Sequence, residues 1–240
     1  MANSGNLPAD KSSPEQIAAF LRRLETVPRP AAAARRGRLM FAMDATASRQ
    51  PTWDRACQLQ GKMFEATAAL GGLDIQLVFF RGFGECKSAP WLACAPELLR
   101  RMTAVTCLAG QTQWCRVLGH AITETGEQRV NALVAVGDSM EEDVDRLGDL
   151  AGQLGVLGVP VFLFQEGDDP TAQRAFQQVA RLSGGAWCRF DGTSAQQLKD
   201  LLSAVAVFAA GGRAALEDLG RRRGGLVRLL TDQMARSARP

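Results

Sequence analysis

Short apolar runs alternate with longer amphipathic stretches from about residue 38 onward, and this alternation constrains the fold more than any other feature. The apolar runs predict strands at residues 39–43, 75–80, 132–136, 160–164 and 186–190, and a turn leads into a further short strand near residues 85–88. Helical periodicity fills the intervals at residues 51–70, 96–106, 113–125, 139–154, 170–182 and 194–208. Strands that are separated by helices pair in parallel, with helices on both faces of the sheet. The sequence therefore predicts an α/β fold with an open, mostly parallel, doubly wound (Rossmann-like) sheet.

One predicted strand differs from the others in how it is connected. Only the four residues Arg81-Gly82-Phe83-Gly84 separate the run at 75–80 from the run at 85–88. A parallel crossover needs a dozen or more residues, whereas a short turn returns the chain antiparallel. We therefore expect residues 85–88 to form a short antiparallel strand at an edge of the sheet.

The domain organisation follows from composition and charge. The 240 residues are 46% hydrophobic, which is enough for one well-buried core over residues 38–210. Residues 1–37 predict a disordered segment, a helix that starts at Ser13 and a linker rich in Pro, Ala and Arg, while residues 211–240 predict a basic helical arm. Residues 1–38 and 211–240 each hold 7 Lys+Arg against 3 Asp+Glu, and the middle holds 14 against 19. The basic ends could contact an acidic partner.

Several function classes are disfavoured by what the sequence lacks. The longest apolar run, near residues 205–210, is far shorter than the roughly 20 residues that cross a bilayer. The N-terminus has no apolar signal-peptide segment, so a cytoplasmic location is expected. No groove-reading or aromatic motif accompanies the arginines, which argues against nucleic acid. His120 is the one histidine and the six cysteines form no C-x-x-C pair, so a zinc-finger-type site is not predicted.

Five oxygen-bearing side chains stand at three separated points that the fold would bring together. Asp44, Thr46 and Ser48 follow the first strand, Asp138 follows the strand at 132–136, and Thr112 opens a mid-chain helix. In an open parallel sheet the ligand site lies just beyond the carboxyl ends of the strands. Hard oxygen ligands are those that Mg²⁺ or Mn²⁺ prefers. The pattern predicts a site for Mg²⁺ or Mn²⁺ in preference to Ca²⁺.

These three elements resemble the von Willebrand factor A-type (VWA) family. D-x-T-x-S at Asp44–Ser48, the lone Thr112 and Gly137-Asp138 are similar to the family's metal-ion-dependent adhesion site (MIDAS), and the resemblance covers about residues 38–210. Thr46 stands where the family usually has Ser but keeps the hydroxyl. The resemblance implies a single-domain intracellular protein that is no enzyme. Its cation, held by the hydroxyls and the two aspartates, would bind an acidic side chain of a protein partner.

Other interpretations stay open at this point. Gly137-Asp138 with Asp143 is similar to the metal-binding element of haloacid-dehalogenase-like phosphatases, in which Asp44 would be the nucleophile, but Thr46 stands where that chemistry needs a second acid. The motif could also be a vestigial metal site on a scaffold, or could cap the following helix. The acids at residues 141–145 are read as the first turn of a helix that Ser139 caps.

Aromatic side chains flank these motifs. Trp114 follows Thr112, Phe83 lies on the predicted turn, and Trp91 follows the short edge strand. They would be anchors for a partner if they surround the site, and ordinary core residues if they do not.

Overall fold

The computed structural model describes residues 36–59, 61–67, 72–190 and 195–223, together with 227, 230 and 232–234. The predicted features of residues 1–35 lie outside the described residues. Within the described residues, six strands form one sheet: β1 (Gly37–Asp44), β2 (Leu73–Arg81), β3 (Glu85–Ser88), β4 (Ala132–Gly137), β5 (Val161–Glu166) and β6 (Ala186–Phe190). The helical elements are η1 (Ala47–Arg49), α2 (Gln50–Leu59), α3 (Gly61–Thr67), α4 (Ala95–Thr103), α5 (Trp114–Glu127), α6 (Val144–Val156), α7 (Pro170–Ser183) and α8 (Ala195–Arg223).

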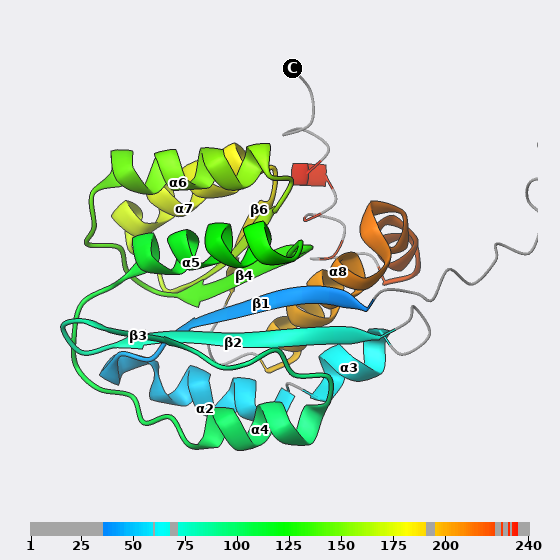
Figure 1. The fold of residues 1–240 in the computed structure, drawn as a ribbon, viewed down its shortest axis with the longest axis horizontal. Coiled ribbons are helices and arrows are strands. Elements are labelled where there is room, and N and C mark those ends of the chain that lie inside the picture. The colour runs from blue at the N-terminus through cyan, green and yellow to red at the C-terminus, as the bar shows by residue number, and fades with distance from the viewer. Residues whose placement is uncertain are drawn as a thin grey trace, which may run out of the picture. The chain divides into compact units, whose positions relative to one another are not determined.

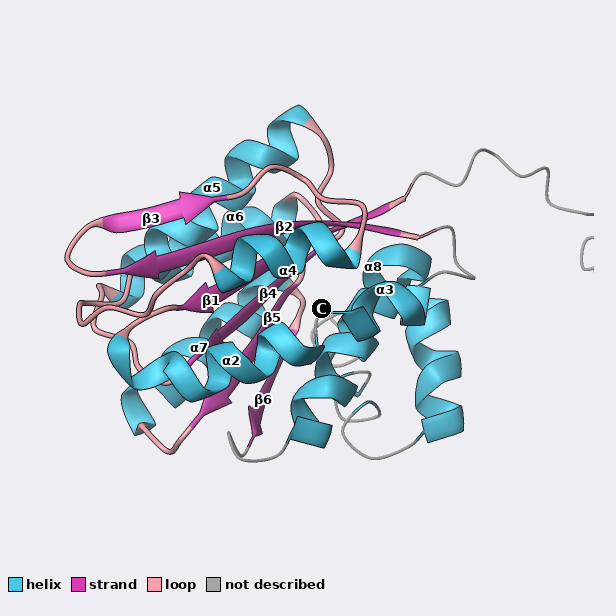
Figure 2. Ribbon diagram, turned by 90° about the horizontal axis from the view of Figure 1, so that it is seen from below, coloured by secondary structure: helices cyan, strands magenta, loops and turns pink. Residues whose placement is uncertain are grey.

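The strand order is β3-β2-β1-β4-β5-β6. β1 pairs in parallel with β2 and β4, the pairs β4–β5 and β5–β6 are parallel, and β2–β3 is antiparallel. The strand arrows of β1 and β2 point to the same side, and β3 runs back against β2 (Figure 2). The predicted fold class is confirmed, including the antiparallel edge strand.

Helices cover both faces of the sheet, with α5, α6 and α7 on one face and α2, α3 and α4 on the other (Figure 1). The side chains of β1 alternate between two apolar clusters. Leu39 and Phe41 pack in the cluster that includes Trp53 of α2 and residues of α8, whereas Met40 packs with α5, α6 and α7. β1 is buried along its whole length, which is why it reads as a continuous apolar run instead of an alternating one.

Three of the predicted helices start or end more than three residues away from the predicted position. The stretch at 51–70 begins earlier, as η1 at Ala47, and continues as two helices, α2 and α3, with residues 60 and 68–71 outside the described residues. α6 starts at Val144 with Asp143 as its N-cap, so the capping box at Ser139 is wrong. α8 continues beyond residue 208 to Arg223, with a non-helical Gly212.

The two outermost strands of the sheet are β3 and β6. On one side β3 pairs with β2, and the pairing continues through Ala89 N to Leu77 O at 2.8 Å. On the other side the Gln233 amide accepts from Trp187 N and donates to Trp187 O of β6, at 2.8 Å each. Gln233 thus stands in for a neighbouring strand.

The segment after residue 210 shares the core of the sheet domain where it is described. Leu216, Val227 and Leu230 belong to the apolar cluster that contains Leu39 and Phe41. Whether 211–240 also acts as a separate basic arm stays a prediction. Among the described residues, no helix combines the length and the apolar character needed to cross a membrane.

Candidate metal centre

The candidate site forms where the central strands end. Met43 of β1 lies opposite Val136 of β4, so Asp44 and Asp138 emerge from neighbouring parallel strands at the same edge of the sheet. Ala45 N donates to Phe80 O of β2 at 2.9 Å, which fixes the chain as it leaves β1. The strand order therefore brings together two carboxylates that are 94 positions apart in the sequence.

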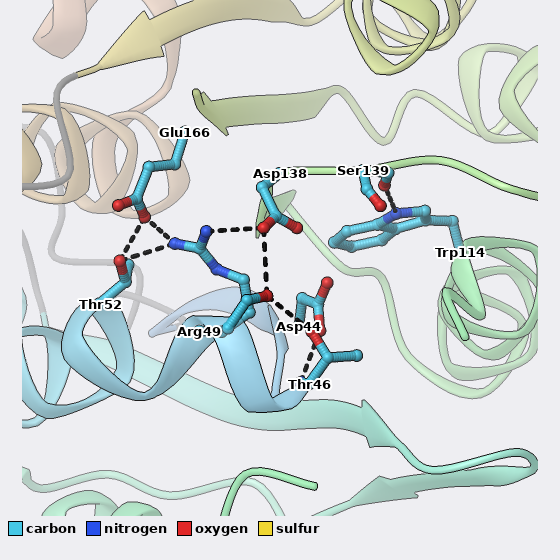
Figure 3. Close-up of polar contacts among 9 residues, drawn as sticks. Asp44, Thr46, Arg49, Thr52, Trp114, Asp138, Ser139 and Glu166 are labelled. Carbon is cyan, nitrogen blue, oxygen red and sulfur yellow. Dashed lines mark hydrogen bonds and ion pairs between the residues drawn. The ribbon is translucent and has the colours of Figure 1, made fainter. Parts of the chain in front are cut away.

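The loop after β1 is organised by its own polar side chains. Asp44 is buried, and its Oδ1 accepts from Thr46 N at 2.7 Å. The Thr46 and Ser48 hydroxyl oxygens are 3.5 Å apart, and the Ser48 hydroxyl donates to Asp138 Oδ2 at 3.3 Å. Figure 3 shows this chain of contacts from Thr46 to Asp138. The D-x-T-x-S spacing thus places one carboxylate and two hydroxyls around a common point.

Thr112 reaches the same place through a reciprocal pair of hydrogen bonds. Its N–H donates to Glu141 Oε2 at 3.3 Å, and its hydroxyl oxygen accepts from Glu141 N at 3.1 Å. Next to it, the Glu142 carboxylate accepts from Trp114 N and from Cys115 N, so it caps α5 from another segment. These contacts fasten the loop that carries Thr112 to the loop that carries Asp138.

One cavity of about 260 Å³ collects the predicted residues. It is lined by Asp44, Thr46, Ala47, Ser48, Ala109, Gly110, Thr112, Asp138, Ser139 and Glu141. All five side chains that the sequence singled out line it, and their role as metal ligands stays a prediction. Among the described residues, no group of three His, Cys, Asp or Glu side chains could hold a metal by itself, so hydroxyl oxygens would have to complete the shell.

Two glycines allow the loops to approach each other this closely. A Cβ on Gly137 would lie 2.4 Å from Trp114, which packs beneath the site and donates through its indole N–H to Ser139 O at 3.1 Å (Figure 3). A Cβ on Gly110 would lie 2.1 Å from Gly82 O. The glycine before Asp138 is therefore required by packing.

Burial raises the pKa of Asp44 to about 6. The hydrogen bonds from Thr46 oppose this rise, the neighbouring Asp138 carboxylate adds to it, and Arg49 lowers it. Removing a carboxylate from water disfavours its charged form unless a counter-charge is close. The cavity thus holds an aspartate whose ionised form is under-compensated by the protein alone.

An arginine that the sequence analysis did not consider lies at the back of the site. Arg49 is 5% exposed; its Nη1 donates to Asp138 Oδ2 at 3.0 Å and its Nη2 to the Thr52 hydroxyl at 2.7 Å. The same Nη2 forms an ion pair with Glu166, to which Thr52 also donates (Figure 3). Arg49 follows Ser48 in the sequence, and Glu166 ends β5, the strand next to β4. A prediction of the spatial strand order was the signal that could have found this pair.

The remaining candidates lie elsewhere or have other roles. Asp143 Oδ1 accepts from Arg146 N at 2.9 Å and caps α6, so this part of the metal-binding element in the phosphatase interpretation does not line the cavity. His120 contacts Gln76 at 3.0 Å and does not line it either. Trp114 is a core residue with 2% exposure.

Phe83 is 84% exposed, on the turn between β2 and β3. That turn is held against the loop that carries Thr112, because Gln111 N donates to Gly82 O at 3.1 Å. Leu108, on the same loop, is 46% exposed. Two exposed apolar side chains therefore lie on the segments that border the cavity.

Comparison with known proteins identifies the fold through structure and not through sequence. No protein-family model matches the chain, and no curated protein matches its sequence. The structure is similar to the SpRpn10 VWA domain, with a TM-score of 0.54 and 15% identity over 69% of this chain and 93% of that domain. The chain has a von Willebrand factor A-type fold.

Two further structures extend the VWA comparison. One is an aerotolerance-related membrane protein from Bacteroides fragilis, with a TM-score of 0.54 and 17% identity over 70% of this chain and 98% of that one. The other is proximal thread matrix protein 1 from the mussel byssus with a zinc-occupied MIDAS motif, with a TM-score of 0.56 and 14% identity over 72% of this chain and 46% of that one. At these identities the similarity concerns the VWA fold.

Proposed function

We propose that this VWA-fold chain is a metal-dependent protein-interaction module. The observation that carries the proposal is the convergence of Asp44, Thr46, Ser48, Thr112 and Asp138, from three separate loops, on one cavity at the carboxyl end of the sheet. Ligand sites of open α/β sheets lie at this edge. The zinc-occupied MIDAS of a neighbour with the same fold supports a divalent cation in general.

The donor set fits a small hard cation. Two carboxylates and three hydroxyls offer oxygen ligands of the kind that Mg²⁺ and Mn²⁺ take in octahedral geometry, whereas Ca²⁺ prefers six to eight oxygens. The raised pKa of Asp44, caused first by burial, also supports a cation at this site. A positive charge in the cavity would stabilise the ionised form of the buried carboxylate.

The five predicted ligands would have two different roles. Asp44 and Asp138 would supply charge, and the three hydroxyls would bind without neutralising the cation further. A bound cation supplies a Lewis acid that can accept a carboxylate from outside the chain. Phe83 and Leu108 would add apolar contacts beside the cavity, where interfaces gain most of their energy from a few large side chains. A partner with an acidic side chain next to an apolar one fits this surface.

The metal is tested first, by the binding of Mn²⁺ measured from the electron paramagnetic resonance signal of the free ion. Asp44→Ala and Asp138→Ala should keep the circular dichroism spectrum of the fold and lose Mn²⁺ binding, and Mg²⁺ should compete with Mn²⁺ in the wild type. Asp54→Ala, on the exposed side of α2, is the matched control and should bind as the wild type does. Unchanged binding in Asp44→Ala would remove the site assignment.

The partner is tested with a displayed random-peptide library selected on the immobilised chain in Mg²⁺. We expect the enriched peptides to contain Asp or Glu, to dissociate in chelator and to bind no longer to Asp44→Ala. Enriched peptides without an acidic residue, or binding that is indifferent to chelator, would contradict a partner carboxylate at the metal.

A further inference from the structure

A buried guanidinium group already occupies one side of the proposed metal site. The side chain of Arg49 is 6% exposed and lies between Asp138, which lines the cavity, and Glu166, which does not. Its Nη1 shares Asp138 Oδ2 with the Ser48 hydroxyl, at 3.0 Å and 3.3 Å. One proposed ligand is therefore engaged by a cation that belongs to the protein (Figure 3).

The charge of Arg49 opposes that of any cation in the cavity. Like charges repel strongly where burial limits screening by water, and a divalent ion at Asp138 would have to share this carboxylate with the guanidinium group. Glu166 acts in the opposite sense: it binds Nη2 of Arg49, together with Thr52, and offsets part of the positive charge. The three charged groups form a row in which Arg49 links the cavity to a carboxylate at the end of β5.

We propose that the positive charge of Arg49 lowers the affinity of this site for divalent ions. Glu166, from outside the cavity, raises the affinity by offsetting part of the charge of Arg49. The inference rests on the proposed function. It concerns two residues that would not contact the metal ion themselves. Both are therefore positioning residues that act through the charge of their neighbours.

Substitutions of Arg49 and Glu166 should change the affinity for Mn²⁺ in opposite directions, although the two residues form one ion pair. Arg49→Met removes the positive charge, keeps an unbranched apolar side chain, and should bind Mn²⁺ about tenfold more tightly. Glu166→Gln leaves the charge of Arg49 less compensated and should bind Mn²⁺ about threefold more weakly. Each variant breaks the same pair and should lose stability. Opposite changes in affinity cannot arise from that shared loss.

Arg38 provides a matched control at the other end of β1. It is 6% exposed and pairs with Glu124 at 3.5 Å, in the same manner but away from the cavity. Arg38→Met should lower stability and keep the wild-type affinity for Mn²⁺. All variants are compared in the full chain at pH 7.5 from the signal of free Mn²⁺, with circular dichroism under the same conditions to confirm that each is folded.

The outcomes separate this inference from the proposed function. Tighter binding by Arg49→Met together with weaker binding by Glu166→Gln supports it, as does binding by Arg49→Met when the wild type binds too weakly to measure. Equal or weaker binding by Arg49→Met overturns it, while loss of binding in Asp44→Ala would still uphold the metal site. If Arg49→Met does not fold, unchanged or tighter binding by Glu166→Gln overturns it. If neither the wild type nor Arg49→Met binds Mn²⁺, both the site and the inference are wrong.

Discussion

Asp44→Asn should make the metal-free protein more stable at neutral pH. Burial raises the pKa of Asp44 from 3.8 to about 6, so the folded state holds a proton there that the unfolded state has already released. Between about pH 4 and pH 6 the folded state binds more protons, and the free energy of unfolding therefore falls as the pH rises. A difference of about two pKa units corresponds to about 3 kcal/mol, which is the stability that ionised Asp44 costs above pH 6.

Asparagine removes this cost and keeps the acceptor for Thr46 N, which lies 2.7 Å from the aspartate oxygen. In chelator at pH 7.5 we expect Asp44→Asn to unfold with a free energy up to about 3 kcal/mol above that of the wild type. The advantage should shrink toward zero near pH 4. The assay is urea denaturation followed by the fluorescence of the four tryptophans, repeated across this pH range.

Added metal should then cancel the advantage of Asp44→Asn. Mg²⁺ at 100 times its Kd stabilises the folded wild type by about 2.7 kcal/mol, and the variant gains nothing because it lacks the carboxylate charge. The two proteins should therefore have nearly equal stability in saturating Mg²⁺. Asp54→Asn is the control, since that side chain is exposed on α2, and it should follow the wild type. An Asp44→Asn variant that is less stable than the wild type in chelator, or an advantage that does not change with pH, would refute the reasoning.

Three further substitutions test other parts of the structure. Gly137→Ala should destabilise the fold by about 1–3 kcal/mol in chemical denaturation, because the new Cβ would lie 2.4 Å from Trp114. Asp143→Ala should cost about 1 kcal/mol through loss of the cap on Arg146 N, with Mn²⁺ affinity unchanged; lost Mn²⁺ binding would revive the phosphatase interpretation. Phe83→Ser should leave the melting temperature unchanged, since the side chain is 84% exposed, and should weaken the peptides selected in Mg²⁺. Undiminished peptide binding by this variant would exclude Phe83 from the interface.

The sheet could be predicted because its signals are local and strong. Every strand except β3 contains a short apolar run bounded by a turn or a helix, and the brief turn at residues 81–84 determined the direction of β3. The site followed from the same topology, since Asp44 and Asp138 end neighbouring strands.

The errors arise where distant side chains override local patterns. Ser139 and Glu142 have the spacing of a helix start, but the Glu142 carboxylate binds the backbone of Trp114 and Cys115, and the Ser139 carbonyl accepts from the Trp114 indole. The N-cap consequently lies four residues later, at Asp143, and the helix begins at Val144. The contacts of Arg49 were missed for a related reason: they depend on how one side chain turns between two strand ends.

The two outermost strands of the sheet restrict how this chain can meet another protein. β3 is four residues long and its Lys87 is largely exposed, a combination that discourages a further strand from pairing there. At the other edge, Gln233 already occupies the backbone donor and acceptor of Trp187. Strand addition, in which a partner extends the sheet, is therefore hindered at both borders, and the loops at the carboxyl end become the natural place of contact. A chain cut before Gln233 would reopen one border and gain a tendency to self-associate through β6.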